Sequence, residues 1–155
     1  MARWNSAFDL ATMTGHAFQC LVTDAELSAS LAAVHTVLRS GGRFAFETRH
    51  PQARAWEGWN PSAASDLVDS AGRALRLWHE TESVSGEVVT FTGTTAAADG
   101  TVLRVDRTRL RFLDEVVLDA FLADAGFVVE ARYGDWDGGP VTGTSREIIT
   151  IARRR

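Results

Sequence analysis

Apolar residues between positions 24 and 38 recur with the spacing of an amphipathic helix. The residues that form this stripe are Leu27, Leu31, Val34 and Leu38, at spacings of four, three and four. Such spacing places them on one face of a helix. Short apolar runs lie on either side, at residues 8–14 and 43–48. A strand, a helix and a second strand in this order form the unit from which parallel sheets are built, so the pattern predicts such a sheet.

The residues at the ends of these elements predict their boundaries. Asp24 is expected to cap the N-terminus of the helix, and Glu26 adds a negative charge to its first turn. Gly41 and Gly42 are expected to end the helix, because glycine adopts the left-handed backbone at little cost. The run at 8–14 mixes apolar residues with Thr and Asp without strict alternation. That mixture is typical of a strand covered on both faces.

The middle of the chain is predicted to form a long loop followed by strands. A loop rich in Pro, Trp and small residues covers residues 50–66, and a segment this long without periodicity is often functional. Strand-like runs follow at residues 74–83, 87–96 and 102–111. Asp99-Gly100, between the second and third runs, is typical of a tight hairpin. We therefore expect an antiparallel meander.

The last part of the chain returns to a helix and strands. A helix is expected from Asp114 or Glu115 through Ala125, followed by a strand at 127–133 and a final strand at 146–152. The chain as a whole, residues 1–155, is expected to form a single domain. Its parts are the strand–helix–strand unit at 8–50, a Trp loop at 51–73, the antiparallel insertion at 74–112, and the helix and terminal β-hairpin at 114–152.

Composition limits the classes of function. The net charge is −4 and Arg153-Arg154-Arg155 is the only basic cluster, so nucleic acid is not an expected partner. No apolar run approaches the length of a membrane span and no signal peptide is evident, so no membrane partner and a cytoplasmic location are expected. The single cysteine, Cys20, excludes an internal disulfide, and its apolar neighbours predict a buried side chain. The four histidines lack ligand spacing, so no metal is expected.

The sequences of three segments resemble the second half of the Rossmann-like S-adenosylmethionine-dependent methyltransferases. The segments read FDLATMTGHAFQCL at 8–21, VHTVLRSGG at 34–42 and RFAFETRHP at 43–51. The resemblance implies an α/β fold with the fourth to seventh strands of a partial Rossmann-like methyltransferase sheet, the last strand being antiparallel beside the fifth. It implies S-adenosylmethionine as cofactor and an unidentified small molecule as substrate.

The same resemblance implies that the chain is the C-terminal part of such an enzyme. The family's Gly-rich loop after the first strand, and the acidic residue that ends its second strand, have no counterpart in this sequence. We expect the isolated chain to be weakly active or inactive. The strand at 8–14 is expected to be an apolar edge, and exposed edges pair with other chains. The expected partner of this edge is a second copy of the chain, as a homodimer, or a missing N-terminal half.

In open parallel sheets, ligands bind beyond the carboxyl ends of the strands. By resemblance, the segment after the first strand contacts the methionine part of the cofactor, with the cofactor-binding residues Met13, Thr14, Gly15, His16 and Phe18. Gly15 would let the backbone approach a ligand closely. His16 is the candidate catalytic residue, as a hydrogen-bond partner of the cofactor carboxylate or as a base toward a substrate hydroxyl or amine, because imidazole titrates near neutral pH. The alternative is that the two residues only end the strand and cap a turn.

Candidate substrate-binding residues follow the other strands of the same rim. They are Glu47, Arg49 and His50 after the second strand, Trp56 and Trp59 in the Trp loop, and Tyr133, Asp135 and Trp136 in the turn after the strand at 127–133. Arg49 could clamp an anion or pair with Glu47; a surface ion pair of little energetic value is the alternative. The tryptophans could form a wall for an aromatic or cationic substrate, or could anchor the long loop. The meander is expected to serve as a lid or a dimer surface.

Two further functions compete with methyl transfer. The chain could be a non-catalytic fragment or a partner-dependent subunit, which cofactor binding would distinguish from an enzyme. It could also be a small-ligand binding module built on the meander and its Trp loop.

Overall fold

The computed structural model describes residues 4–155 and builds them into two four-stranded sheets. The chain divides into two compact units, the first formed by residues up to 53 together with 111–155, and the second by residues 54–110. Among residues 4–155, no helix has the length and apolar character needed to cross a membrane. The expectation that the whole chain forms one domain stays a prediction.

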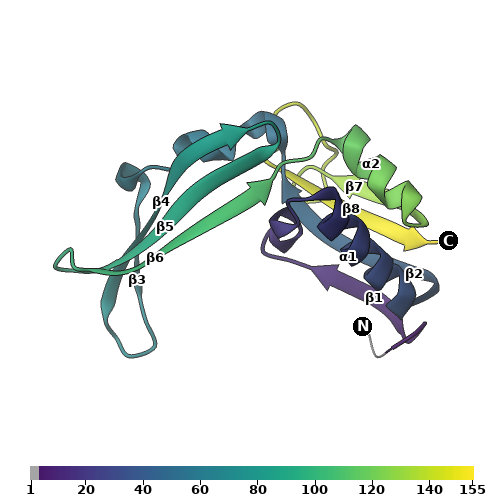
Figure 1. Cartoon of the computed structure of the whole chain (residues 1–155), viewed down its shortest axis with the longest axis horizontal. Helices are drawn as coiled ribbons and strands as arrows, with labels where there is room; N and C mark the ends of the chain where they lie inside the picture. The colour runs from purple at the N-terminus through teal and green to yellow at the C-terminus, as the bar shows by residue number, and fades with distance from the viewer. Residues whose placement is uncertain (1–3) are drawn as a thin grey trace. The chain divides into compact units, whose positions relative to one another are not determined.

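The first unit is a mixed sheet with helices, shown with its element labels in Figure 1. Its strands are β1 (Phe8–Met13), β2 (Leu38–Arg49), β7 (Phe127–Tyr133) and β8 (Glu147–Arg154), and its helices are α1 (Asp24–Val37), α2 (Glu115–Asp124) and the short 3₁₀ helices η1 (Ala17–Cys20) and η2 (Pro51–Ala53). The strand order is β1-β2-β8-β7. β1 and β2 are parallel, and β8 runs antiparallel between β2 and β7. The predicted insertion of an antiparallel last strand beside the second strand is confirmed.

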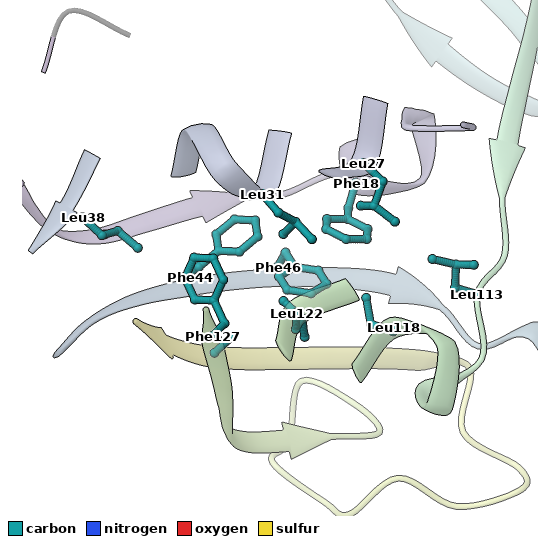
Figure 2. Packing of buried hydrophobic residues seen from close by; sticks show 11 residues of the cluster. Phe18, Leu27, Leu31, Leu38, Phe44, Phe46, Leu113, Leu118, Leu122 and Phe127 are labelled. Atoms are coloured by element: carbon teal, nitrogen blue, oxygen red, sulfur yellow. The ribbon is translucent and has the colours of Figure 1, made fainter. Parts of the chain in front are cut away.

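The core of this unit lies between its two helices and one face of the sheet. Phe44 and Phe46 of β2 point to this face, since residues two apart on a strand share a face. Figure 2 shows them meeting the leucines of both helices, Leu27 and Leu31 from α1 and Leu118 and Leu122 from α2. All six side chains are at most 2% exposed. Burial of each such side chain stabilises the fold by roughly 1.5–3 kcal/mol, so this layer holds the sheet and helices together.

β1 differs from the prediction of a strand buried on both faces. Phe8 is 41% exposed and Leu10 is 57% exposed. β1 is the outermost strand of the sheet, with β2 as its neighbour on one side. The prediction that β1 is covered on both faces was therefore wrong. The predicted apolar edge of the sheet is present.

The ends of α1 also differ from prediction. The N-cap is Thr23 and not Asp24: the Thr23 Oγ1 accepts a hydrogen bond from the Glu26 N–H at 3.2 Å, and the Glu26 carboxylate accepts one from the Thr23 N–H at 2.9 Å. This reciprocal pair satisfies two otherwise unpaired donors. The helix ends at Val37, because Leu38 already pairs with Phe8 of β1. Gly41 has a φ of 77°, but within an irregular start of β2 and not at the helix end.

The elements near the C-terminus agree with prediction. Asp114 caps α2 by accepting a hydrogen bond from the Val117 N–H at 2.9 Å. Gly126 follows the helix with a φ of 85°, a conformation that glycine adopts without the steric cost of a Cβ. β7 covers the predicted residues 127–133, and β8 begins one residue later than expected.

The second unit is an antiparallel sheet. Its strands are β3 (Ser65–Val68), β4 (Ala74–Ser85), β5 (Val88–Ala97) and β6 (Val102–Arg111), in the order β3-β4-β5-β6, with the last residue of β6 counted in the first unit. The predicted meander is confirmed. The Pro- and Trp-rich loop is less irregular than expected, because it contains the short 3₁₀ helices η3 (Ala55–Gly58) and η4 (Pro61–Ala63) and leads into β3, which pairs with β4.

Candidate functional site

The carboxyl ends of β1, β2 and β7 lie along one edge of the first sheet. Met13, the last residue of β1, pairs with Phe46, which precedes Glu47 on β2. Glu47 pairs with Ile149 of β8, and Ile149 pairs with Tyr133, the last residue of β7. We call this edge the rim. The residues that follow β1, β2 and β7 therefore begin at the same edge, where ligands of open α/β sheets bind.

The chain leaves β1 through two consecutive residues with left-handed backbone. Gly15 has a φ of 70° and His16 a φ of 58°. The backbone N–H of His16 donates a hydrogen bond to Glu47 Oε1 at 2.8 Å. No atom lies within 4 Å of the position that a Cβ on Gly15 would occupy. The turn is therefore fixed by a carboxylate on one side, while its backbone is open to a ligand at Gly15.

The ring of His16 is held by a second carboxylate. His16 Nε2 lies 2.9 Å from Oε2 of Glu147, the first residue of β8. Both side chains are partly buried, with exposed fractions of 24% and 20%. Glu47 is only 3% exposed. Two acidic side chains from neighbouring strands thus hold one histidine, through its backbone and through its ring.

Sequence reasoning did not identify Glu147 as a site residue. Its position follows from strand register, since Glu147 pairs with Arg49 where β8 lies beside β2. The sequence offers one signal, an acidic residue directly before the apolar run Ile148-Ile149, but an acidic residue at the start of a strand is common. The contact with His16 becomes visible only when the order of strands is known.

Gln19 is a second residue that the sequence did not single out. It is 1% exposed, and its Nε2 donates to the Arg111 carbonyl at 3.1 Å. Its Oε1 accepts from the Arg49 N–H at 3.2 Å. A fully buried amide that is hydrogen-bonded on both sides fixes the backbone that it bridges. Gln19 therefore ties η1 to the end of β2, beside the turn that carries His16.

Arg49 extends this cluster at the end of β2. Burial lowers the pKa of its guanidinium, and the nearby carboxylates of Glu147 and Glu47 oppose that shift. Arg49 thus sits near several acidic groups, as expected of a residue that orders a polar site. Cys20 is exposed and not buried as predicted, because η1 turns it away from the core that Phe18 enters.

The remaining residues predicted for the cofactor have different surroundings. Thr14 is exposed and Met13 is partly buried against the core. Phe18 is 3% exposed and its ring stacks on Phe46 with a centroid distance of 4.2 Å. Phe18 therefore belongs to the hydrophobic core in Figure 2 and anchors η1 to the sheet.

His50 has a clear local role. It is 6% exposed, and its Nδ1 accepts a hydrogen bond from the Gln52 N–H at 3.1 Å. Its backbone N–H donates to the Arg146 carbonyl at 2.8 Å. The side chain and the backbone of His50 together hold the bend that leads from β2 into η2.

The turn after β7 is exposed. Trp136 is 68% exposed, and the Asp135 carboxylate accepts a hydrogen bond from the Trp136 N–H at 2.7 Å. Tyr133 is partly buried at the end of β7. A hollow of about 330 Å³ is lined by polar residues of this segment, Asp135, Asp137, Thr142, Thr144, Ser145 and Arg146, with Gly134, Gly139 and Pro140.

Trp56 and Trp59 belong to the second unit. The Trp56 carbonyl accepts a hydrogen bond from the Thr81 hydroxyl at 2.7 Å. The Trp59 ring packs against Phe91 at a centroid distance of 4.6 Å and near His79 at 6.0 Å. These contacts attach the loop to β4 and β5, as in the anchoring alternative.

No protein-family model and no curated protein matches this sequence at a significant level. Solved structures do match it. A methyltransferase that depends on S-adenosylmethionine, from Clostridium acetobutylicum, has a TM-score of 0.79 at 16% identity, over 99% of this chain and 61% of its own. The CcbJ methyltransferase from Streptomyces caelestis has a TM-score of 0.79 at 15% identity, over 100% and 64%.

A third similar structure is described as CalS10 from Micromonospora echinaspora, an amino pentose methyltransferase with S-adenosylmethionine bound. It has a TM-score of 0.67 at 23% identity, over 100% of this chain and 61% of its own. The chain thus spans about three fifths of the length of these structures. It has the fold of a part of the S-adenosylmethionine-dependent methyltransferases, and the predicted partial Rossmann-like sheet is confirmed.

Proposed function

We propose that this chain forms the methyl-transfer side of an S-adenosylmethionine-dependent methyltransferase that acts on a small molecule. The observation that carries the proposal is the position of His16 at the rim, between Glu47 at 2.8 Å from its backbone nitrogen and Glu147 at 2.9 Å from its ring. The fold shared with such enzymes supports the reaction class.

The turn after β1 is the proposed cofactor contact. Gly15 leaves open space beside its backbone, which fits a ligand that approaches closely. Met13, Thr14, Gly15 and His16 would contact the methionine part of S-adenosylmethionine directly, and Phe18 would act by fixing η1 against the core. The bound cofactor supplies a sulfonium methyl, which needs alignment and exclusion of water more than chemical activation.

His16 is proposed to accept the substrate proton. The Glu147 carboxylate can only accept hydrogen bonds when ionised, so it favours the proton on His16 Nε2 and leaves Nδ1 as the acceptor. Nδ1 could take the proton that a hydroxyl or amine loses on methylation. The alternative role, a hydrogen bond from Nδ1 to the cofactor carboxylate, needs a proton on both ring nitrogens, because Nε2 donates to Glu147.

The proposed substrate is a small molecule that carries an amine or a hydroxyl group. An amine fits the similarity to CalS10, which is an amino pentose methyltransferase. Glu47 and Arg49 would orient it from the end of β2. The other proposed substrate residues are His50, Trp56, Trp59, Tyr133, Asp135 and Trp136.

The proposal includes a partner for the free edge of β1. Phe8 and Leu10 are largely exposed on this outermost strand, and unpaired strand edges are ready to accept another strand. That strand would come from a second copy of this chain or from a separate polypeptide. The Leu10→Lys variant should reduce such pairing in sedimentation experiments.

Nuclear magnetic resonance can test the cofactor site residue by residue. Addition of S-adenosylhomocysteine to the ¹⁵N-labelled chain should shift the amide signals of Gly15, His16 and Gln19, while those of β3 stay unchanged. Shifts confined to the second unit would favour a small-ligand binding module instead. No shift at saturating ligand would favour a non-catalytic fragment or a partner-dependent subunit.

A further inference from the structure

β6 is an edge strand whose first half is exposed. It is the last strand of the sheet β3-β4-β5-β6, so β5 is its neighbour on one side and no strand within residues 4–155 pairs with the other. Val102, Leu103 and Val105 are 55%, 53% and 57% exposed. A ten-residue edge with exposed apolar side chains is a template for strand addition.

The charges on β6 select a particular partner. Arg104 and Asp106 lie on the same face of the strand, two residues apart, and are hydrogen-bonded to each other at 2.9 Å. In an antiparallel pair of two β6 strands centred on Val105, Arg104 of each copy faces Asp106 of the other. A centre at residue 104 or 106 would instead place identical charges opposite each other, which is destabilising.

The remaining positions are compatible with the same register. Val105 would face Val105 of the other copy, and Leu103 would face the long side chain of Arg107. On the other face of the sheet, which also carries Arg104 and Asp106, Val102 would face Thr108. The two-fold axis repeats the pair of Arg104 and Asp106, so the attraction between the basic and the acidic side chain acts twice in the dimer.

From this self-complementarity we infer that β6 is a self-association surface, whose partner is β6 of a second copy of this chain. The two sheets join into one eight-stranded antiparallel sheet. The contact is narrow, so a weak and concentration-dependent dimer is expected. This surface is separate from the edge of β1, and it does not depend on the proposed methyl transfer.

Charge reversal tests the register. Arg104→Asp places an acidic side chain opposite Asp106 in both halves of the contact, and Asp106→Arg places a basic one opposite Arg104. Each variant should weaken the dimer by about tenfold in analytical ultracentrifugation, since opposite charges across strands become like charges. An equimolar mixture of the two variants should form a heterodimer with the affinity of the wild type. In that heterodimer, both acidic side chains of the first variant face the two basic side chains of the second.

The mixture separates this contact from effects within one chain, because loss of the internal Arg104–Asp106 bond cannot be repaired by mixing. Arg54→Asp is the matched control: it makes the same charge change in an exposed ion pair with Glu57 and should leave the dimer unchanged. Circular dichroism should show all variants folded. A wild type that stays monomeric up to about 1 mM, or a mixture that fails to associate, would overturn the inference. Loss of all association on Leu10→Lys, with both charge-reversal variants associating as tightly as the wild type, would place the contact at β1 instead.

Discussion

His16 and Glu147 are 131 residues apart in the chain, yet the ring of one lies 2.9 Å from the carboxylate of the other. The contact exists because β8 returns from the C-terminal part of the chain to lie beside β2. It joins the turn after the first strand to the start of the last strand. The rim is therefore assembled by the order of the strands and not by any local motif.

The first prediction concerns the protonation state of the His16 ring. In the wild type at pH 9, the ¹⁵N signals of the imidazole should report a proton on Nε2, because the Glu147 carboxylate accepts a hydrogen bond from that atom. Glu147→Gln should produce a mixture of tautomers, since an amide can accept or donate. Glu130→Gln, on an exposed carboxylate bound to Arg43, is the control and should leave the His16 signals unchanged. A proton on Nδ1 in the wild type would contradict the proposed role of Glu147.

The second prediction concerns Gln19. Gln19→Ala removes the buried amide that donates a hydrogen bond to the Arg111 carbonyl and accepts one from the Arg49 N–H. Each of the two lost hydrogen bonds contributes about 0.5–1.5 kcal/mol, so the free energy of unfolding in urea should fall by about 1–3 kcal/mol. Gln52→Ala, at an exposed position, should change it by less than about 0.5 kcal/mol. Equal effects of the two substitutions would show that the Gln19 bridge contributes little.

The third prediction concerns the glycine that follows α2. A Cβ on Gly126 would lie 2.9 Å from His35 Nε2, and the backbone has a φ of 85°. Gly126→Ala should therefore destabilise the fold through both the left-handed backbone, at about 1–2 kcal/mol, and displacement of His35. Gly138→Ala isolates the backbone effect, because Gly138 has a φ of 82° and no atom lies within 4 Å of the position that its Cβ would occupy. The melting temperature should fall more for Gly126→Ala, and an equal loss would mean that His35 moves aside freely.

The fourth prediction is a dependence of stability on pH. Burial, and next the positive charge of Arg154, lower the pKa of His35 from its ordinary value of 6.5. The unfolded chain therefore binds a proton at a higher pH than the folded chain does. This stabilising contribution is complete above the unfolded pKa and is lost as the pH falls toward the folded pKa. Between pH 7.5 and 5.5, the urea midpoint should fall more for the wild type than for His35→Gln; parallel decreases would rule out His35 as the cause.

The sequence predicted elements whose signals are local. α2 and β7 were predicted to within a residue, because Asp114 caps the helix and Gly126 ends it through contacts within the same few residues. Thr23 was missed as the cap of α1 because Thr23 and Asp24 both accept N-terminal hydrogen bonds well, and only the reciprocal bond with Glu26 decides between them.

What depends on neighbours in space could not be predicted. The exposure of Leu10 depends on whether a strand or helix covers β1, and its own sequence does not say. Glu147 and Gln19 become site residues through register and packing with β2. The prediction that His16 and Glu47 lie at one edge of the sheet is confirmed, but the residues that hold them in place required the structure, and the binding site itself stays a prediction.

The turn of Gly15 and His16 is the proposed contact for the cofactor. Calorimetric titration of the purified chain with S-adenosylhomocysteine tests it most directly, with the His16→Asn variant beside the wild type, because Asn tolerates the left-handed backbone at this position. The account predicts binding in the micromolar range that His16→Asn weakens by about tenfold or more, while Arg39→Ala, an exposed substitution on the same sheet, leaves it unchanged. Equal affinity of the wild type and His16→Asn, or no binding at all, would show that this turn is not the cofactor site.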